Sequence, residues 1–296
     1  MHLLLVVYAL KGDRSGTRRG HYGSSKDRQH DRRRLQRLQH GIRPTGSVAL
    51  ADGALGQGGR MRRSSGRVAP PRSGFVGFRF PPDVIMLAVR WYLRYGLSYR
   101  DVEELLAERG IAVDHVTVYR WVQRFTPLLI DAARPCRHVL GDRWFADETY
   151  VKLAGRWVYL YRAIDQYGQV IDVLVSEKRD LAATCRFFTR ALGHGSHPSA
   201  VTTDKAPAYP RVLYELVPAA CHLTERYGNN RIEADHGRLK ARLRPMRGLK
   251  QLRSVRVISA GHAFIQNVRR GHYELGSDTD PKHRLTTAFT ELAFAI

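Results

Sequence analysis

The sequence predicts a helical N-terminal domain followed by an α/β domain built on one mixed sheet. Its apolar residues recur with a helical period between residues 75 and 134, and the period changes to that of strands after residue 140. Three strand-like segments then come in succession, and helical segments alternating with short apolar runs follow them. This order is typical of a mixed sheet covered by helices. The length of 296 residues allows about two domains.

The charge balance indicates a polyanionic partner. The chain has 49 Lys and Arg against 27 Asp and Glu, a net charge of +22, which favours nucleic acid first and a membrane surface second. Three cysteines without C-x-x-C spacing support neither a disulfide framework nor a zinc finger. Because no apolar run is long enough for a membrane helix, we expect no membrane partner and a cytoplasmic, nucleoid-associated protein.

Residues 1–72 differ from the rest in composition. They hold 16 Lys and Arg against 4 Asp and Glu, with few aromatic residues and no sustained period. Such a segment buries too little apolar surface to offset its ordering entropy, so we expect it to be disordered. It is either a basic arm that touches phosphates or an appendage that is not part of the natural product.

Three helices are expected next, in a domain spanning residues 75–134. The first begins at Pro81-Pro82, the second at a capping box formed by Ser98 and Asp101, and the third after Asp114 as N-cap. Two short helices joined by a tight glycine-containing turn suggest a helix-turn-helix. The alternative is a plain three-helix bundle with solvated arginines. The expected DNA-contacting face of the third helix carries Thr117, Arg120, Gln123 and Arg124.

The second domain is expected over residues 140–275, with residues 276–296 as a C-terminal tail. Strands are predicted at 142–153, 156–165 and 169–176, joined by hairpin turns at residues 154–155 and 166–168. The later elements are predicted to be helices at 180–192, 207–216, 229–246 and 252–272, with short extended segments at 199–203 and 221–225.

Three acidic residues occupy positions suited to catalysis. Asp147 lies inside the first strand on an apolar face, where an unpaired charge is costly, while Glu148 points the other way. Asp204 sits at a strand end, and Glu233 lies in the first turns of a helix. His236 and Lys240 follow Glu233 on one helix face.

Converging carboxylates repel one another unless a cation joins them. Mg²⁺ takes oxygen ligands only and is commonly held by carboxylates and substrate phosphate. Two such ions stabilise the attacking and leaving oxygens of an in-line displacement. We therefore expect phosphoryl transfer on a nucleic acid backbone, with water or a DNA 3′-hydroxyl as nucleophile and Mg²⁺ (or Mn²⁺ in its place) as cofactor. Lys240 would grip a neighbouring phosphate.

At these residues the chain resembles the DDE-class bacterial transposases of the family named for insertion sequence six, to which insertion sequence twenty-six belongs. The resemblance covers about residues 75–275 and none of residues 1–72. It is carried by YLRYGLSYRDVEELLAERG (92–110), VDHVTVYRWVQR (113–124), DETYVKL (147–153), GRWVYLYRAID (155–165), TDKAPAY (203–209) and the segment 229–240.

The family implies a ribonuclease-H-like catalytic fold behind a helix-turn-helix. It implies Mg²⁺-dependent strand transfer at terminal inverted repeats by a homodimer or larger assembly on double-stranded DNA. Its metal-binding catalytic triad maps onto Asp147, Asp204 and Glu233, and its basic residue onto Lys240. The 29-residue step from Asp204 to Glu233 is shorter than in the type member, which leaves the docking of Glu233 open.

Several alternatives stay open. Asp235 is expected to pair with Arg231 on the helix surface, and it is the runner-up for the third carboxylate. His236, Arg238 and Arg242 are candidate DNA contacts, although a basic run of this kind is usually a solvated face. The function is either that of a transposase, that of a DNA-binding regulator or inactive transposase remnant, or that of a ribonuclease-H-like nuclease that only hydrolyses.

Overall fold

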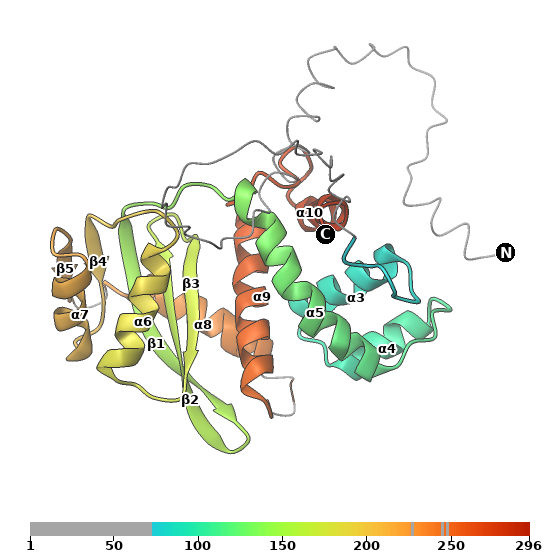
Figure 1. Ribbon diagram of the computed structural model, residues 1–296, viewed down its shortest axis with the longest axis horizontal. Helices are drawn as coiled ribbons and strands as arrows, with labels where there is room; N and C mark the ends of the chain where they lie inside the picture. Colours follow the sequence, from blue (N-terminus) through green and yellow to red (C-terminus); the bar gives the residue numbers. More distant parts are fainter. Residues whose placement is uncertain (1–72, 226–227, 244–245, 247–248) are drawn as a thin grey trace, which may run out of the picture.

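A computed structural model describes residues 73–296 except 226–227, 244–245 and 247–248. The expectations for residues 1–72 fall outside the described residues. Within the described part, a five-stranded sheet with its covering helices lies beside a group of helices formed by both ends of this region (Figure 1). None of the described helices has the length and apolarity that a membrane span requires.

The helices before the sheet begin where the sequence predicts. They are α3 (Pro82–Arg94), α4 (Tyr99–Ala107) and α5 (His115–Ala133), followed by a short 3₁₀ turn, η1 (Arg134–Cys136). The Ser98 hydroxyl accepts a hydrogen bond from the Asp101 backbone N–H, and the Asp101 carboxylate accepts one from the Ser98 N–H. The Asp114 carboxylate accepts hydrogen bonds from two N–H groups in the first turn of α5. These caps satisfy N–H groups that the helices themselves leave free.

The sheet is mixed, as predicted, with strand order β3-β2-β1-β4-β5. Strands β1 (Arg143–Leu153), β2 (Arg156–Asp165) and β3 (Val170–Ser176) are antiparallel, whereas β4 (Ala200–Thr202) and β5 (Cys221–Leu223) add in parallel. The β1–β2 hairpin turns at Ala154 and Gly155, whose φ angles of 47° and 86° are both positive. Two such residues form the tight turn that matches the twist of paired strands.

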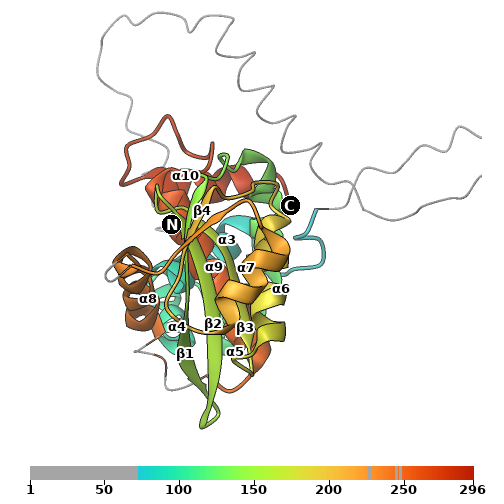
Figure 2. The ribbon, with the colours of Figure 1, turned by 90° about the vertical axis from the view of Figure 1, so that its left-hand side faces the viewer.

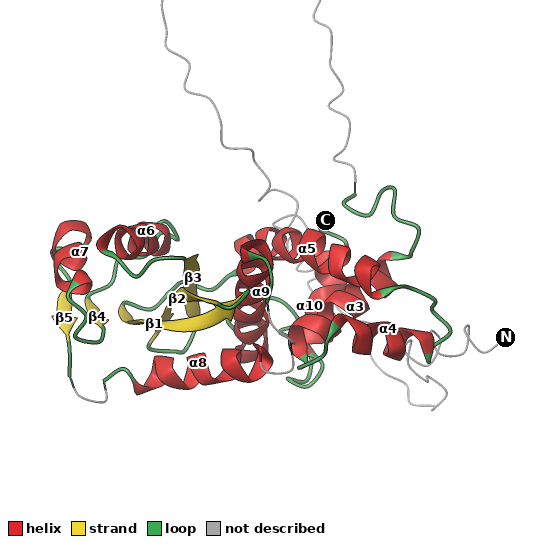
Figure 3. Ribbon diagram, turned by 90° about the horizontal axis from the view of Figure 1, so that it is seen from below, coloured by secondary structure: helices red, strands yellow, loops and turns green. Residues whose placement is uncertain are grey.

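Helices cover both faces of the sheet (Figure 3). On one face α6 (Leu181–Leu192) and α7 (Ala208–Leu216) pack against alternate residues of β1 and β2, including Trp144, Ala146 and Tyr161. On the other face α8 (Asn230–Leu243) and α9 (Leu252–Arg270) cover the residues between, such as Phe145 and Leu160. Side chains alternate between the faces of a strand, so one strand contributes to both cores.

Helix α9 lies between the sheet and the N-terminal helices (Figure 1). Towards the sheet, the Asn267 amide pairs with the backbone N–H and carbonyl of Val170 in β3. Towards α3 and α5, Gly261 lies so close that an added Cβ would be 2.6 Å from Leu93 and 2.9 Å from Thr126. One apolar core consequently runs from the N-terminal helices through α9 to the sheet.

The segment after residue 275 contains a further helix, α10 (Arg284–Ala293). It packs on α3, α5 and α9 through its buried residues Leu285, Ala288, Phe289 and Leu292. This segment therefore contributes to the apolar core.

Candidate active site

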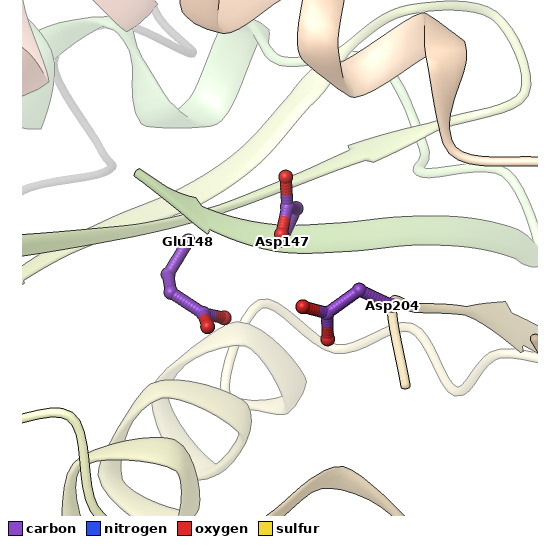
Figure 4. Close-up of side chains that lie close together, drawn as sticks. All are labelled: Asp147, Glu148 and Asp204. Atoms are coloured by element: carbon purple, nitrogen blue, oxygen red, sulfur yellow. The ribbon is translucent and has the colours of Figure 1, made fainter. Parts of the chain in front are cut away.

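The acidic site forms where β4 stops pairing with β1. The parallel β1–β4 pairing ends with Phe145 opposite Thr202, so the edge of β1 beyond Phe145 is open to the loop that follows β4. Asp204 lies in that loop, beside Asp147 and Glu148 of β1 (Figure 4). One oxygen from each of these three carboxylates lies within 4.8 Å of the other two. Asp147 and Asp204 thus meet as the sequence predicts.

Glu148 is the residue that the sequence reasoning missed. Its side chain leaves the opposite face of β1 from Asp147, and it extends toward Asp204, which lies on that side of the strand (Figure 4). Its side chain is 5% exposed, and its two oxygens accept hydrogen bonds from the Tyr209 hydroxyl and the Arg179 guanidinium. Arg179 also lies 3.3 Å from Asp204. The single available signal was its place next to Asp147 in the sequence.

Crowding of the carboxylates is evident in their proton affinity. Burial, followed by the negative charges of Glu148, Asp204 and Glu233, raises the pKa of Asp147 to about 7. Burial also raises the pKa of Glu148. A cation placed among these oxygens would reverse both effects, because it favours the charged form of each carboxylate.

Helix α8 is attached to β1 directly beside Asp147. The Asn229 amide donates a hydrogen bond to the Ala146 carbonyl, which β4 no longer pairs. Glu233, in the first turn of α8, is exposed. It lies outside the group of three close carboxylates, although its charge reaches Asp147. His236 is buried, with Nδ1 3.6 Å from an Asp147 oxygen, and burial lowers its pKa to about 4.

Asp235 differs from its prediction. It is 1% exposed, and its carboxylate lies 2.5 Å from Arg162 Nε of β2 and 2.5 Å from an Arg270 nitrogen of α9. Arg231, its predicted partner, instead donates to the Gln166 carbonyl. Although burial alone would raise the pKa of Asp235, the Arg162 and Arg270 charges hold it below its ordinary value. Asp235 thus joins three elements beneath the site.

The predicted basic contacts on α8 separate into two groups. Arg238 and Lys240 are exposed, and Lys240 lies over the ring of Tyr150. Arg242 is 5% exposed and donates to the Tyr92 carbonyl of α3, with its guanidinium over the Tyr92 ring. The expectation that Arg242 contacts DNA is therefore wrong, because its charged end is used to attach α8 to α3. His236 likewise faces the acidic site and not the exterior.

Fewer of the predicted DNA-contacting residues of α5 are exposed than the sequence predicts. Arg120 and Arg124 are exposed. The Thr117 hydroxyl donates to the Asp114 carboxylate, 2.6 Å away, and belongs to the helix cap. Gln123 is 5% exposed, so its placement on the outer face is wrong, because the side chain is buried in the interior. The outer face therefore retains the two arginines.

The site combines carboxylate oxygens that can bind a metal ion with basic side chains beside them. Asp147, Glu148 and Asp204 present hard oxygen ligands, and no cysteine is among them. Such a donor set suits Mg²⁺ or a similar divalent cation. Exposed Lys240 and Arg238 lie on the helix that runs past these carboxylates and can meet phosphate groups.

Residues 141–272 match a protein family described as a DDE domain. The transposase for insertion sequence-like element IS431mec of Staphylococcus aureus (strain Mu50) is 42% identical over 169 residues, which are 55% of this chain and 75% of that protein. The transposase for insertion sequence element IS257 in transposon Tn4003, also from Staphylococcus aureus, is 41% identical over the same shares.

Among solved structures, the HTLV-2 integrase catalytic core domain in complex with magnesium, in its trimeric form, is 20% identical. The similarity covers 45% of this chain and 88% of that chain, with a TM-score of 0.34.

Proposed function

This chain belongs to the DDE transposases of bacterial insertion sequences, in the family named for insertion sequence six, and from that membership we propose how its residues carry out transposition. The reaction is DNA strand transfer, in which a 3′-hydroxyl attacks a phosphorus atom and displaces another 3′-oxygen. We assign the chemistry to the acidic site at the edge of β1. The bound substrate would be the terminal inverted repeats of the element, and the second substrate the target DNA.

The enzyme uses a divalent metal, which we propose to be Mg²⁺, with Mn²⁺ able to replace it. The donor chemistry fits, because clustered carboxylate oxygens are what these ions prefer, and a cation beside Asp147 would favour the charged form that burial and the neighbouring carboxylates disfavour. Asp147, Asp204 and Glu233 would hold the metal. When bound, it stabilises the negative charge that develops on the attacking and leaving oxygens.

The remaining residues hold these carboxylates and the DNA in place. Tyr209 and Arg179 fix the buried Glu148, which keeps a third negative charge beside Asp147 and Asp204. Glu233 approaches from α8, and Asn229 sets the position of that helix on β1. Lys240 would bind a phosphate next to the reacting one, which places the phosphorus in line with the nucleophile.

Recognition of the element ends is assigned to a helix-turn-helix formed by α4 and α5. Exposed Arg120 and Arg124 lie on the outer face of α5, and the surplus of positive charge favours DNA. We propose that residues 75–134 bind the ends and residues 140–275 form a ribonuclease-H-like catalytic domain, which the strand order 3-2-1-4-5 supports. A homodimer or larger assembly would hold both ends, at the nucleoid in the cytoplasm.

The meeting of Asp147 and Asp204 at the end of the β1–β4 pairing carries the proposal. The test is a strand-transfer assay with Mg²⁺ and labelled oligonucleotides that bear the element's ends. Wild type is compared with Asp147→Asn, Glu233→Gln and Glu148→Gln. Glu215→Gln is the matched control, since Glu215 pairs with Arg211 on the surface of α7. End binding by each variant is measured separately.

We expect joined products from wild type and the control, with unchanged end binding in all variants. Asp147→Asn and Glu233→Gln should reduce joining by at least about 100-fold, as removal of a charge-stabilising group does in other enzymes. Binding without joining in every protein would favour the regulator or inactive remnant. Nicked products that never join would favour a nuclease. Normal joining by Glu233→Gln with loss in Glu148→Gln would assign the third carboxylate to Glu148.

A further inference from the structure

The β1–β2 hairpin extends beyond the helices that cover the rest of the sheet (Figure 1, Figure 2). Its strands remain paired as far as Leu153 opposite Arg156, directly before the two-residue turn. The backbone N–H of Ala154 also donates to the Leu249 carbonyl, which supports the turn from the side. The projecting part of the hairpin is therefore an ordered, fully paired β-hairpin and not an irregular loop.

Two aromatic residues on this projection have half of their surface open. Tyr150 and Trp157 are each 55% exposed, and their ring centroids lie 5.0 Å apart with the planes at 84°. They are diagonal neighbours across the two strands, on the face that also carries Glu148. Their mutual contact stabilises the hairpin, but it uses only part of each ring. The outward ring surface is available to a ligand.

Positive charge surrounds the aromatic pair. Lys152 Nζ lies 5.8 Å from the centre of the Trp157 ring, and Lys240 Nζ of α8 lies 5.2 Å from the centre of the Tyr150 ring. Arg156 is exposed at the turn. In the part of the chain that the structure describes, no carboxylate forms an ion pair with these three cations. Aromatic rings among cations are the chemistry that binds unpaired nucleic acid, by base stacking and phosphate contact.

The distance to the acidic site matches a few nucleotides. Tyr150 follows Asp147 by three residues of β1, or about 10 Å along the strand. At about 3.4 Å per phosphate along one DNA strand, this is about three nucleotides. A base within a duplex is stacked and paired, so its face reaches a protein ring only after it leaves the helix. The pair is thus placed to take a base that has separated near the reacting phosphate.

We propose that Tyr150 and Trp157, flanked by Lys152 and Lys240, form a stacking site for unpaired DNA bases within about three nucleotides of the phosphate at the acidic site. This inference rests on the proposed function, because it names the form of DNA that the same site accepts. The site holds the strand end open during joining. It prefers a frayed or overhanging end over a blunt duplex and is indifferent to base identity.

The test uses the full chain in the Asp147→Asn background, without metal, so that binding is measured apart from chemistry. Two element-end duplexes are compared at one salt concentration, one blunt and one with three unpaired nucleotides at the 3′ end. Trp157 is itself the probe. The other three tryptophans, Trp91, Trp121 and Trp144, are half-buried or buried, so the difference from a Trp157→Phe protein isolates its fluorescence.

We expect the overhanging end to quench Trp157 fluorescence and the blunt end to leave it unchanged. Tyr150→Ala/Trp157→Ala should bind the overhanging end about 10-fold more weakly, the effect of losing a stacked base, and the blunt end as before. Trp157→Phe keeps a ring and should keep most of the preference. Tyr214→Ala is the matched control, because Tyr214 is 79% exposed on α7, away from the hairpin.

Equal binding of both ends by wild type, or an equal loss for both ends in the double variant, would overturn the inference. A double variant that lowers the oligomeric state in sedimentation while leaving the preference intact would instead make the hairpin a contact between protein copies. Failure of the proposed function is separate, since it would appear as a lack of joining by wild type while the preference for overhanging ends persists.

Discussion

Removal of the Asp235 carboxylate should strongly destabilise the protein. Arg162 is completely buried, and Asp235, also buried, supplies the charge beside it. Without that charge, Arg162 remains as an uncompensated cation in the interior, at a cost of about 3–5 kcal/mol. In a chain of this size that corresponds to a fall in Tm of roughly 6–20 °C. We therefore expect Asp235→Ala to unfold at much lower temperature and urea concentration.

Two further variants isolate the cause. Glu233→Gln lies two residues away on the same helix but is exposed, so it should change stability by no more than about 0.5 kcal/mol. Arg162→Met combined with Asp235→Leu removes both buried charges and should recover most of the loss, because a well-packed apolar pair replaces a buried ion pair with little penalty. Arg270, which is 21% exposed, can turn toward solvent in that variant.

The reasoning would be refuted by an Asp235→Ala protein within about 1 kcal/mol of wild type in urea unfolding. If such a stable variant had also lost strand transfer, Asp235 would be a catalytic carboxylate. If the double variant were no more stable than Asp235→Ala alone, the loss would come from the packing of α8 and not from the unpaired Arg162 charge.

Three other changes test separate parts of the structure. Tyr209→Phe removes the hydroxyl that holds Glu148. It should raise the Mg²⁺ concentration for half-maximal joining about 10-fold and leave joining at saturating Mg²⁺ unchanged. An unchanged Mg²⁺ concentration for half-maximal joining would contradict this prediction. Burial, followed by neighbouring arginine charges, lowers the pKa of His262 to about 3. The contribution of neutral His262 to the free energy of unfolding is therefore fully present above about pH 6.5. It decreases by about 1.4 kcal/mol per pH unit as the pH falls toward 3. His262→Gln should reduce this dependence of the free energy of unfolding on pH, measured from unfolding curves between pH 3 and 6.5. Both proteins carry Asp147→Asn, because the raised pKa of Asp147 makes the free energy of unfolding fall as the pH rises to about 7. Gly261→Ala brings a methyl group to 2.6 Å from α3 and should cost about 1–3 kcal/mol, whereas an unchanged Tm would mean that the helices can separate.

The elements that were predicted well are those with local causes. Ser98 and Asp114 cap their helices through bonds to residues two or three positions away, and the turn at Ala154 and Gly155 needs only two adjacent residues. Asp204 was found because a polar residue directly after a short apolar strand lies at a sheet edge. Such signals lie within a few residues of the feature that they specify.

The misplaced residues depend on contacts that are distant in the sequence. Glu148 joins the acidic site because β4 leaves β1 after Phe145, which no local pattern reveals. Asp235 is buried because Arg162, 73 positions earlier, lies beneath α8. Helical spacing places Gln123 on an outer face, and the basic run after Lys240 suggests a DNA contact for Arg242, but both side chains are buried by other helices. Spacing gives the faces of a helix but not their neighbours.

Helix α9 sets the distance between the N-terminal helices and the acidic site. It is joined to β3 through Asn267 and to α3 and α5 through the close contact at Gly261, so we expect the helices assigned to recognition to keep a fixed distance from the acidic site. Along DNA, each added base pair shifts a phosphate by about 3.4 Å and turns it by about 34° around the axis. A fixed distance between the two sites is compatible with only one rotational position of the terminal phosphate around the DNA axis, relative to the recognised bases. On the proposed assignment of recognition to α4 and α5, the packing of α9 would fix the spacing between the recognised bases and the terminal phosphate of an element.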